Sequence, residues 1–80
     1  YHTPLFEPWM GPFRDMFAPV PFVPPSSPVY SCSTSEPFPA DPEAIRRLCV
    51  DHWVTPVEFT RMVRRMHADG VRLFVEAGPR

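Results

Sequence analysis

The sequence predicts an α/β protein in which a short helix is followed by a strand, two helices and a second strand. Two segments, residues 42–53 and 55–70, combine helical periodicity with recognisable ends. Two apolar runs, residues 28–34 and 71–78, are typical of strands. A strand–helix–helix–strand order is a crossover unit of a parallel sheet. Since two strands cannot close such a sheet, we expect further strands to come from elsewhere.

The N-terminal stretch predicts one short helix that begins near Pro8. Apolar residues recur there at helical spacing: Leu5, Trp9, Phe13, Met16 and Phe17. Pro8 and Pro12 oppose a long helix starting at Pro4, because proline lacks the N–H that a helix interior needs. Eleven of the 13 prolines lie in residues 4–42. The connector at about residues 18–28 is therefore predicted to be extended, with polyproline-like geometry.

The helix over residues 42–53 has a clear start. Asp41 is suited to cap it, and Pro42 suits the first helical position. Its buried face is predicted to carry Ile45, Leu48, Cys49 and His52. The helix should end near Trp53, because the residue before a proline disfavours helical geometry and Thr55 precedes Pro56.

The helix over residues 55–70 is predicted from both of its ends. Thr55 and Glu58 have the spacing of a capping box, with Pro56 at the first helical position. One apolar stripe is predicted to be buried: Phe59, Met62, Val63 and Met66. Gly70 fits the left-handed position that ends many helices.

Length and composition describe one small domain and exclude several functions. An 80-residue chain buries only about 60% of the surface that its unfolded form exposes, so its core is marginal. The net charge of −1 argues against nucleic acid as the main partner. No apolar run has the length of a membrane span, and the first residues lack a signal-peptide pattern. Cys32 and Cys49 are predicted to be buried free thiols, and we expect a cytoplasmic protein.

Three sets of residues are candidates for chemistry or recognition. His2 could serve as a general base near neutral pH, or it is an ordinary exposed histidine. Cys49 and His52, with Cys32 and His67, could contribute to a metal site, but they match no zinc spacing and core packing is favoured. The P-x-x-P sequence at residues 21–24 could dock on an aromatic groove, although a structural connector is favoured.

The order of four motifs resembles the C-terminal part of the acyltransferase domain of polyketide and fatty-acid synthases. These domains are the malonyl-CoA:acyl-carrier-protein transacylases. YHTPLFEPW resembles the family's histidine segment, and PVYSCST resembles the strand that follows. DHWVTPVEF resembles the helix junction before a Pro-Val motif, and MHADGVRLFVEAGPR resembles the closing strand. The resemblance covers all 80 residues and is greatest to iterative type I synthases of the enediyne and polyunsaturated-fatty-acid kinds.

The resemblance implies a fragment of an α/β-hydrolase-like acyltransferase core, with residues 1–80 as its C-terminal portion. A serine attacks the thioester of malonyl-CoA, and the malonyl group then passes to the phosphopantetheine thiol of an acyl carrier protein. His2 matches the histidine that acts as general base and acid. The backbone carbonyl at His52, where many relatives carry Gln, is implied to hold the other ring nitrogen. Cys32 stands where Asn is common, so a polar contact near the site is weakened.

The residue before the histidine is implied to set acyl selectivity. In related synthases Phe there goes with malonyl units and Ser with methylmalonyl, so the bulky Tyr1 implies malonyl. The family's serine, oxyanion-hole glutamine and carboxylate-binding arginine lie upstream. We therefore expect the remainder of a parent synthase chain as a partner, besides the carrier protein. No metal or permanently bound cofactor is expected.

Two alternatives to the acyltransferase remain at this point. One is a small non-catalytic interaction module that uses Pro19–Pro28 as a ligand. The other is a small zinc-binding protein.

Overall fold

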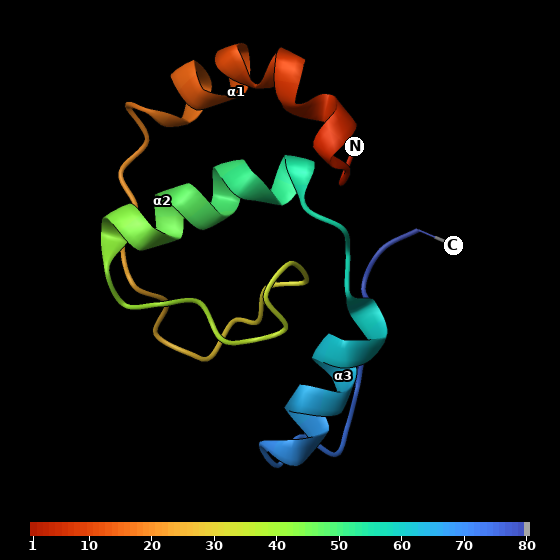
Figure 1. The fold of residues 1–80 in the computed structure, drawn as a ribbon. Helices are drawn as coiled ribbons and strands as arrows, with labels where there is room; N and C mark the ends of the chain where they lie inside the picture. The colour runs from red at the N-terminus through yellow and green to blue at the C-terminus, as the bar shows by residue number, and fades with distance from the viewer. Residues whose placement is uncertain (80) are drawn as a thin grey trace.

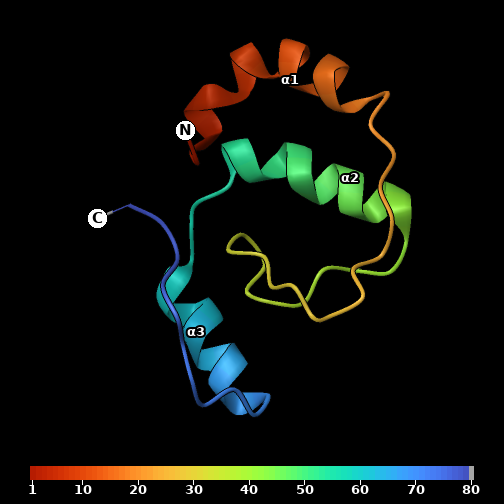
Figure 2. The ribbon, with the colours of Figure 1, turned by 180° about the vertical axis from the view of Figure 1, so that it is seen from behind.

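Two helical arms lie side by side in the computed structural model, which describes residues 1–79 (Figure 1). The first arm joins the 3₁₀ helix η1 (Pro4–Trp9) to α1 (Met10–Phe17), and the second joins α2 (Pro42–Asp51) to the 3₁₀ helix η2 (His52–Val54). Because η1 packs against η2 and α1 against α2, the arms run antiparallel. The N-terminus therefore lies beside the end of the second arm, as the view from behind also shows (Figure 2).

The first arm begins earlier than its prolines predicted. Thr3 caps η1, its hydroxyl accepting the Leu5 N–H at 3.4 Å. The chain takes 3₁₀ geometry through Pro8 and becomes α-helical only at Met10. Pro12 then falls in the first turn of α1, where helical N–H groups have no intrahelical partner and a missing donor is tolerated.

The covered residues of the first arm are only partly the apolar residues that recur at helical spacing in the sequence. Met10 is fully buried, and Phe13 is half-buried. Leu5 is 80% exposed and Trp9 61%, although both belong to the apolar residues that recur at helical spacing in the sequence. The half-buried or buried positions follow a neighbouring helical stripe: Phe6, Met10, Phe13 and Phe17.

The second arm follows its prediction closely. The Asp41 carboxylate accepts the Ala44 N–H at 2.9 Å, and Pro42 is the first helical residue. The helix gives way to η2 after Asp51, which matches the expected end near Trp53. Ile45 is buried as predicted.

Helix α3 (Phe59–Ala68) begins later than the predicted capping box requires. The Thr55 hydroxyl donates to the Asp51 carbonyl at 2.7 Å, and the Glu58 N–H donates to the Cys32 carbonyl at 2.8 Å. A capping box requires the Thr55 hydroxyl to accept the Glu58 N–H. Each of these groups bonds a different partner, so the predicted capping box was wrong.

The end of α3 forms as predicted. Gly70 has a φ of 109°, which side chains disfavour. Its N–H donates to the His67 carbonyl at 3.1 Å, and the Val71 N–H donates to the Met66 carbonyl at 3.0 Å. This pair of bonds is the Schellman arrangement, which satisfies the last carbonyls of the helix.

The apolar stripe of α3 lines an open groove with the C-terminal segment, which runs back along the helix (Figure 2). The groove has a volume of about 640 Å³ and is lined by Phe59, Met62, Val63, Met66, Phe74, Val75 and Glu76. Met62 is buried as predicted, whereas Phe59 is 63% exposed. The four predicted residues therefore lie on one face of α3, but the rest of the chain covers only part of that face.

Neither predicted strand forms within residues 1–79. In the segment 28–34 only Tyr30 makes a bridge, antiparallel to Pro37. The flanking hydrogen bonds run from the Ser31 N–H to the Glu36 carbonyl at 2.9 Å and from the Phe38 N–H to the Val29 carbonyl at 2.7 Å. The segment 71–78 has no β-partner among the described residues. A strand needs a paired neighbour, and the predicted sheet takes further strands from elsewhere, so the two strands and the α/β fold class stay a prediction.

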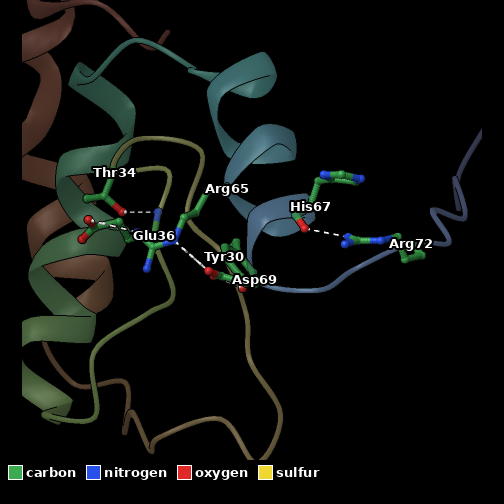
Figure 3. A network of polar contacts seen from close by, with 7 residues as sticks. All are labelled: Tyr30, Thr34, Glu36, Arg65, His67, Asp69 and Arg72. Atoms are coloured by element: carbon green, nitrogen blue, oxygen red, sulfur yellow. Dashed lines mark hydrogen bonds and ion pairs between the residues drawn. The ribbon is translucent and has the colours of Figure 1, made fainter.

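A polar network joins the loop around Tyr30 to the end of α3 (Figure 3). The Tyr30 hydroxyl donates to Asp69 at 2.6 Å, and Arg65 makes ion pairs with Asp69 at 3.1 Å and with Glu36 at 3.4 Å. In the same view Arg72 donates to the His67 carbonyl at 2.7 Å. These contacts attach α3, which lies apart from the two arms, to the rest of the chain.

The connector at residues 18–28 contains no helix or strand and is mostly exposed, with Phe22 half-buried. Its extended, polyproline-like geometry stays a prediction. The Arg46 guanidinium lies over the Phe22 ring at 5.2 Å from its centroid. The same guanidinium donates to the carbonyls of Phe17 and Ala18. Arg46 of α2 therefore fixes both the end of α1 and the start of the connector.

Among residues 1–79, the helices are too short and too polar to cross a bilayer.

Candidate active site around His2

Two consecutive carbonyls at the end of the second arm hold His2. The His2 backbone N–H donates to the Trp53 carbonyl at 2.7 Å, and the His2 ring nitrogen Nδ1 lies 2.9 Å from the His52 carbonyl. These contacts join residues fifty positions apart in the sequence. His2 has a φ of 60°, in a region that few residues other than glycine adopt. The backbone and the side chain of His2 are thus fixed by the same short helix.

The contact with the His52 carbonyl determines the tautomer of the His2 ring. A carbonyl oxygen only accepts hydrogen bonds, so Nδ1 must carry the proton that is donated. In the neutral ring the other nitrogen, Nε2, then keeps its lone pair. Among residues 1–79, no hydroxyl is hydrogen-bonded to Nε2. The ring is therefore in the tautomer that accepts a proton at Nε2.

Aromatic rings surround this contact. The Trp53 ring is nearly parallel to the His2 ring, at 9° and 6.2 Å between centroids. Tyr1 meets the edges of Phe6 at 5.1 Å and of Trp53 at 5.4 Å, and Phe13 lies 4.7 Å from Trp53. Tyr1 is nevertheless 75% exposed, so much of its ring is accessible from outside.

The His52 side chain has a different environment from its carbonyl. Burial lowers the pKa of the His52 imidazole from its ordinary value of 6.5, and the nearby charge of His2 lowers this pKa further. A neutral His52 ring is favoured mainly because burial penalises its charged form, and repulsion from a positive charge on the neighbouring His2 would add to this effect. His52 therefore contributes its backbone oxygen to the site and an uncharged ring beside it.

Cys32 lies near the site but does not contact His2. Its thiol donates to the Met62 sulfur at 3.4 Å, and its carbonyl accepts the Glu58 N–H. Cys32 also lines a cavity of about 350 Å³, whose other lining residues are Phe17, Tyr30, Ser31, Phe38, Leu48, Cys49, His52 and Trp53. The structure thus places Cys32 in a mainly apolar cavity that His52 also lines.

Three of the residues considered for a metal site, Cys32, Cys49 and His52, line the same cavity but do not form a ligand set. Among residues 1–79, no group of three or more histidine, cysteine, aspartate or glutamate side chains could hold a metal ion. Cys32 and Cys49 are free thiols, each half-buried. Burial raises the pKa of the Cys49 thiol, which favours its protonated form.

Sequence reasoning from the residues missed Trp53. Its carbonyl and its ring both contact the His2 residue, yet the sequence indicated it only as a helix end. The available signal was its place two residues before the Thr55–Pro56 pair, since a helix that stops there leaves its last carbonyls without backbone donors.

Comparison with known proteins finds similarity along the whole chain to short stretches of two very large synthases. The chain is 32% identical over 82 residues to one component of the polyunsaturated fatty acid synthase of Thraustochytrium sp., which aligns 100% of this chain with 3% of that protein. It is 34% identical over 80 residues to polyketide synthase GfsB of Streptomyces halstedii, which aligns 99% of this chain with 1% of that protein. No family model and no solved structure matches the chain. The similarity supports a segment of a polyketide or polyunsaturated-fatty-acid synthase, and the acyltransferase assignment stays a prediction.

Proposed function

We propose that this chain supplies the catalytic histidine of a malonyl-transferring acyltransferase within a polyketide or fatty-acid synthase. The observation that carries the proposal is the hydrogen bond from His2 Nδ1 to the His52 carbonyl. It leaves Nε2 as a proton acceptor, which is what a general base beside a serine needs. The similarity to a polyunsaturated fatty acid synthase and to a polyketide synthase supports the biosynthetic setting.

The proposed mechanism is a two-step acyl transfer through a serine outside this chain. In the first step the serine oxygen attacks the thioester carbon of malonyl-CoA, while Nε2 of His2 takes the hydroxyl proton. The bond from carbon to sulfur breaks, and Nε2 gives the proton to the departing thiolate of coenzyme A. In the second step Nε2 takes the proton of the phosphopantetheine thiol on an acyl carrier protein. The thiolate attacks the carbonyl carbon of the malonyl group, the bond from that carbon to the serine oxygen breaks, and Nε2 returns the proton to the serine oxygen.

The residues of this chain hold and orient the base in this proposal. Nδ1 stays bonded to the His52 carbonyl throughout, so the ring can gain and lose a proton at Nε2 without turning. Tyr1, fixed by its edge contacts with Phe6 and Trp53, would border the acyl α-carbon. A bulky side chain there favours malonyl over methylmalonyl by about 1–3 kcal/mol, the usual value of one methyl group.

The proposal is tested in the longer synthase that would contain this chain. Radiolabelled malonyl-CoA should form an acyl-enzyme with the unaltered protein and none with His2→Ala. His67→Ala is a matched control, because His67 is exposed on α3 and remote from the two carbonyls. Ordinary labelling of His2→Ala would refute the role given to His2.

A further inference from the structure

We infer that Pro56 is a positioning residue that keeps the carbonyls of His52 and Trp53 available to His2. It touches no reacting atom, and it acts by preventing backbone N–H groups from bonding these two carbonyls. Its meaning for catalysis rests on the proposed function, but its effect on the His2 ring is a property of this chain alone.

The first part of the argument concerns the donor that Pro56 lacks. In an α-helix the carbonyl of residue i accepts the N–H of residue i+4. For the His52 carbonyl that residue is position 56, where proline has no N–H. Within the described residues 1–79, the His52 carbonyl receives only a long bond of 3.4 Å from the Thr55 N–H and the bond of 2.9 Å from His2 Nδ1. Because position 56 has no N–H, the shorter hydrogen bond to the His52 carbonyl is the one from the His2 ring.

The second part concerns the backbone before the proline. A residue that precedes proline is pushed out of helical geometry, and Thr55 is extended, with φ −108° and ψ 135°. The extended turn ends the second arm, and it carries the Val57 N–H away from the Trp53 carbonyl, its helical acceptor. Among residues 1–79, that carbonyl accepts only the His2 N–H, at 2.7 Å.

Both effects act on one strained residue. The φ of 60° at His2 is costly for a side chain of its size and persists only where surrounding contacts enforce it. The two carbonyls supply those contacts, one to the backbone and one to the ring. With an ordinary residue at position 56, the helix could continue through Thr55, and N–H groups of the chain would compete for both oxygens.

The test uses the whole chain, assembled by chemical synthesis with a ¹⁵N-labelled imidazole at His2. Nitrogen NMR distinguishes the tautomer protonated at Nδ1 from the one protonated at Nε2. Pro56→Ala should lower the ratio of the Nδ1–H tautomer to the Nε2–H tautomer about five-fold, which is the effect of losing one ordinary hydrogen bond. Replacing Pro56 with N-methylalanine, which also lacks the N–H, should restore the original ratio. Pro42→Ala, which removes the first proline of α2, is the matched control and should leave the ring unchanged.

Three outcomes would overturn the inference. One is an unchanged tautomer in a folded Pro56→Ala chain, and another is the same shift with N-methylalanine as with alanine. If Pro56→Ala does not fold, two measurements still test the inference. They are the tautomer ratio in the N-methylalanine chain and the NMR coupling across the hydrogen bond between Nδ1 and the His52 carbonyl in the unaltered chain. Absence of that coupling in the unaltered chain also overturns the inference. None of these measurements depends on acyl transfer, so failure of the proposed function would appear separately in the labelling assay.

Discussion

The imidazole rings of His2 and His52 lie 4.4 Å apart, while Nδ1 of His2 also reaches the His52 carbonyl. His52 therefore presents two groups to His2: a carbonyl that accepts its hydrogen bond, and a ring that would repel it if both rings were charged. The hydrogen bond and the close rings are compatible while the His52 ring is neutral, in agreement with its lowered pKa.

The first prediction is a loss of stability on acidification that comes from His52. Burial and the nearby His2 lower the pKa of His52 in the folded chain below its ordinary value of 6.5. The unfolded chain then binds the proton more tightly, so stability is complete above about pH 6.5 and is lost as pH falls through the folded pKa. His52→Gln keeps the backbone carbonyl and should flatten this part of the pH profile. Thermal melts between about pH 8 and about pH 5 measure it, and Arg61→Gln, an exposed change on α3, should retain the original slope.

The second prediction concerns Arg46, which joins α1, α2 and the connector. Arg46→Ala removes two hydrogen bonds to the end of α1 and the contact with the Phe22 ring. We expect a loss of about 1–2 kcal/mol in the free energy of unfolding, measured by urea titration. Arg47→Ala changes the exposed neighbour on the same helix and should cost much less. Equal losses for the two variants would contradict the bridging role of Arg46.

The third prediction concerns the hydrogen bond between Tyr30 and Asp69. This bond is the largest cause of a lowered pKa at Asp69, with Arg65 adding to it, and it raises the pKa of Tyr30. The stabilisation by Asp69 is therefore present above its ordinary pKa of 3.8 and lost as pH falls through the folded pKa. Tyr30→Phe should lower the melting temperature near neutral pH and reduce the further drop on acidification. Tyr1→Phe, which removes a phenol from another part of the surface, should do neither.

The helix starts and stops that use local chemistry were predictable from the sequence. Asp41 and Pro42 begin α2, and Gly70 ends α3, because each acts on backbone groups within a few residues. The start of α3 was not predictable in this way. The Glu58 N–H bonds the distant Cys32 carbonyl, and this tertiary contact overrides the local capping signal.

The strands and the site show two other limits of sequence reasoning. A strand is defined by pairing with a neighbour, so an apolar run such as residues 71–78 predicts only the tendency to pair. The contact between His2 and the His52 carbonyl was implied by family resemblance, since residues so far apart give no local signal of it. The place of Pro56 at i+4 from His52 was readable from the sequence, but its significance depends on knowing where His2 lies.

The fourth prediction is slow alkylation of Cys49 in the folded chain. The thiolate is the reactive form, and burial raises the pKa of this thiol, which lowers the thiolate fraction. Iodoacetamide should therefore modify Cys49 more slowly in the native chain than in the same chain unfolded by urea. Peptide mass spectrometry after timed quenching gives both rates, and equal rates would show that the fold does not protect this thiol.

The last prediction follows from the position of Tyr1 and rests on the proposed function. Tyr1 is 75% exposed, yet its ring is held by Phe6 and Trp53, so its free side is an accessible wall beside His2. In the synthase that would contain this chain, Tyr1→Ser should open that wall and shift the ratio of kcat/KM for malonyl-CoA over methylmalonyl-CoA by about 10- to 200-fold toward the methylated substrate. Tyr1→Phe keeps the ring and should preserve the original preference. If Tyr1→Ser changed the two rates equally, Tyr1 would support the fold of the site and not its selectivity.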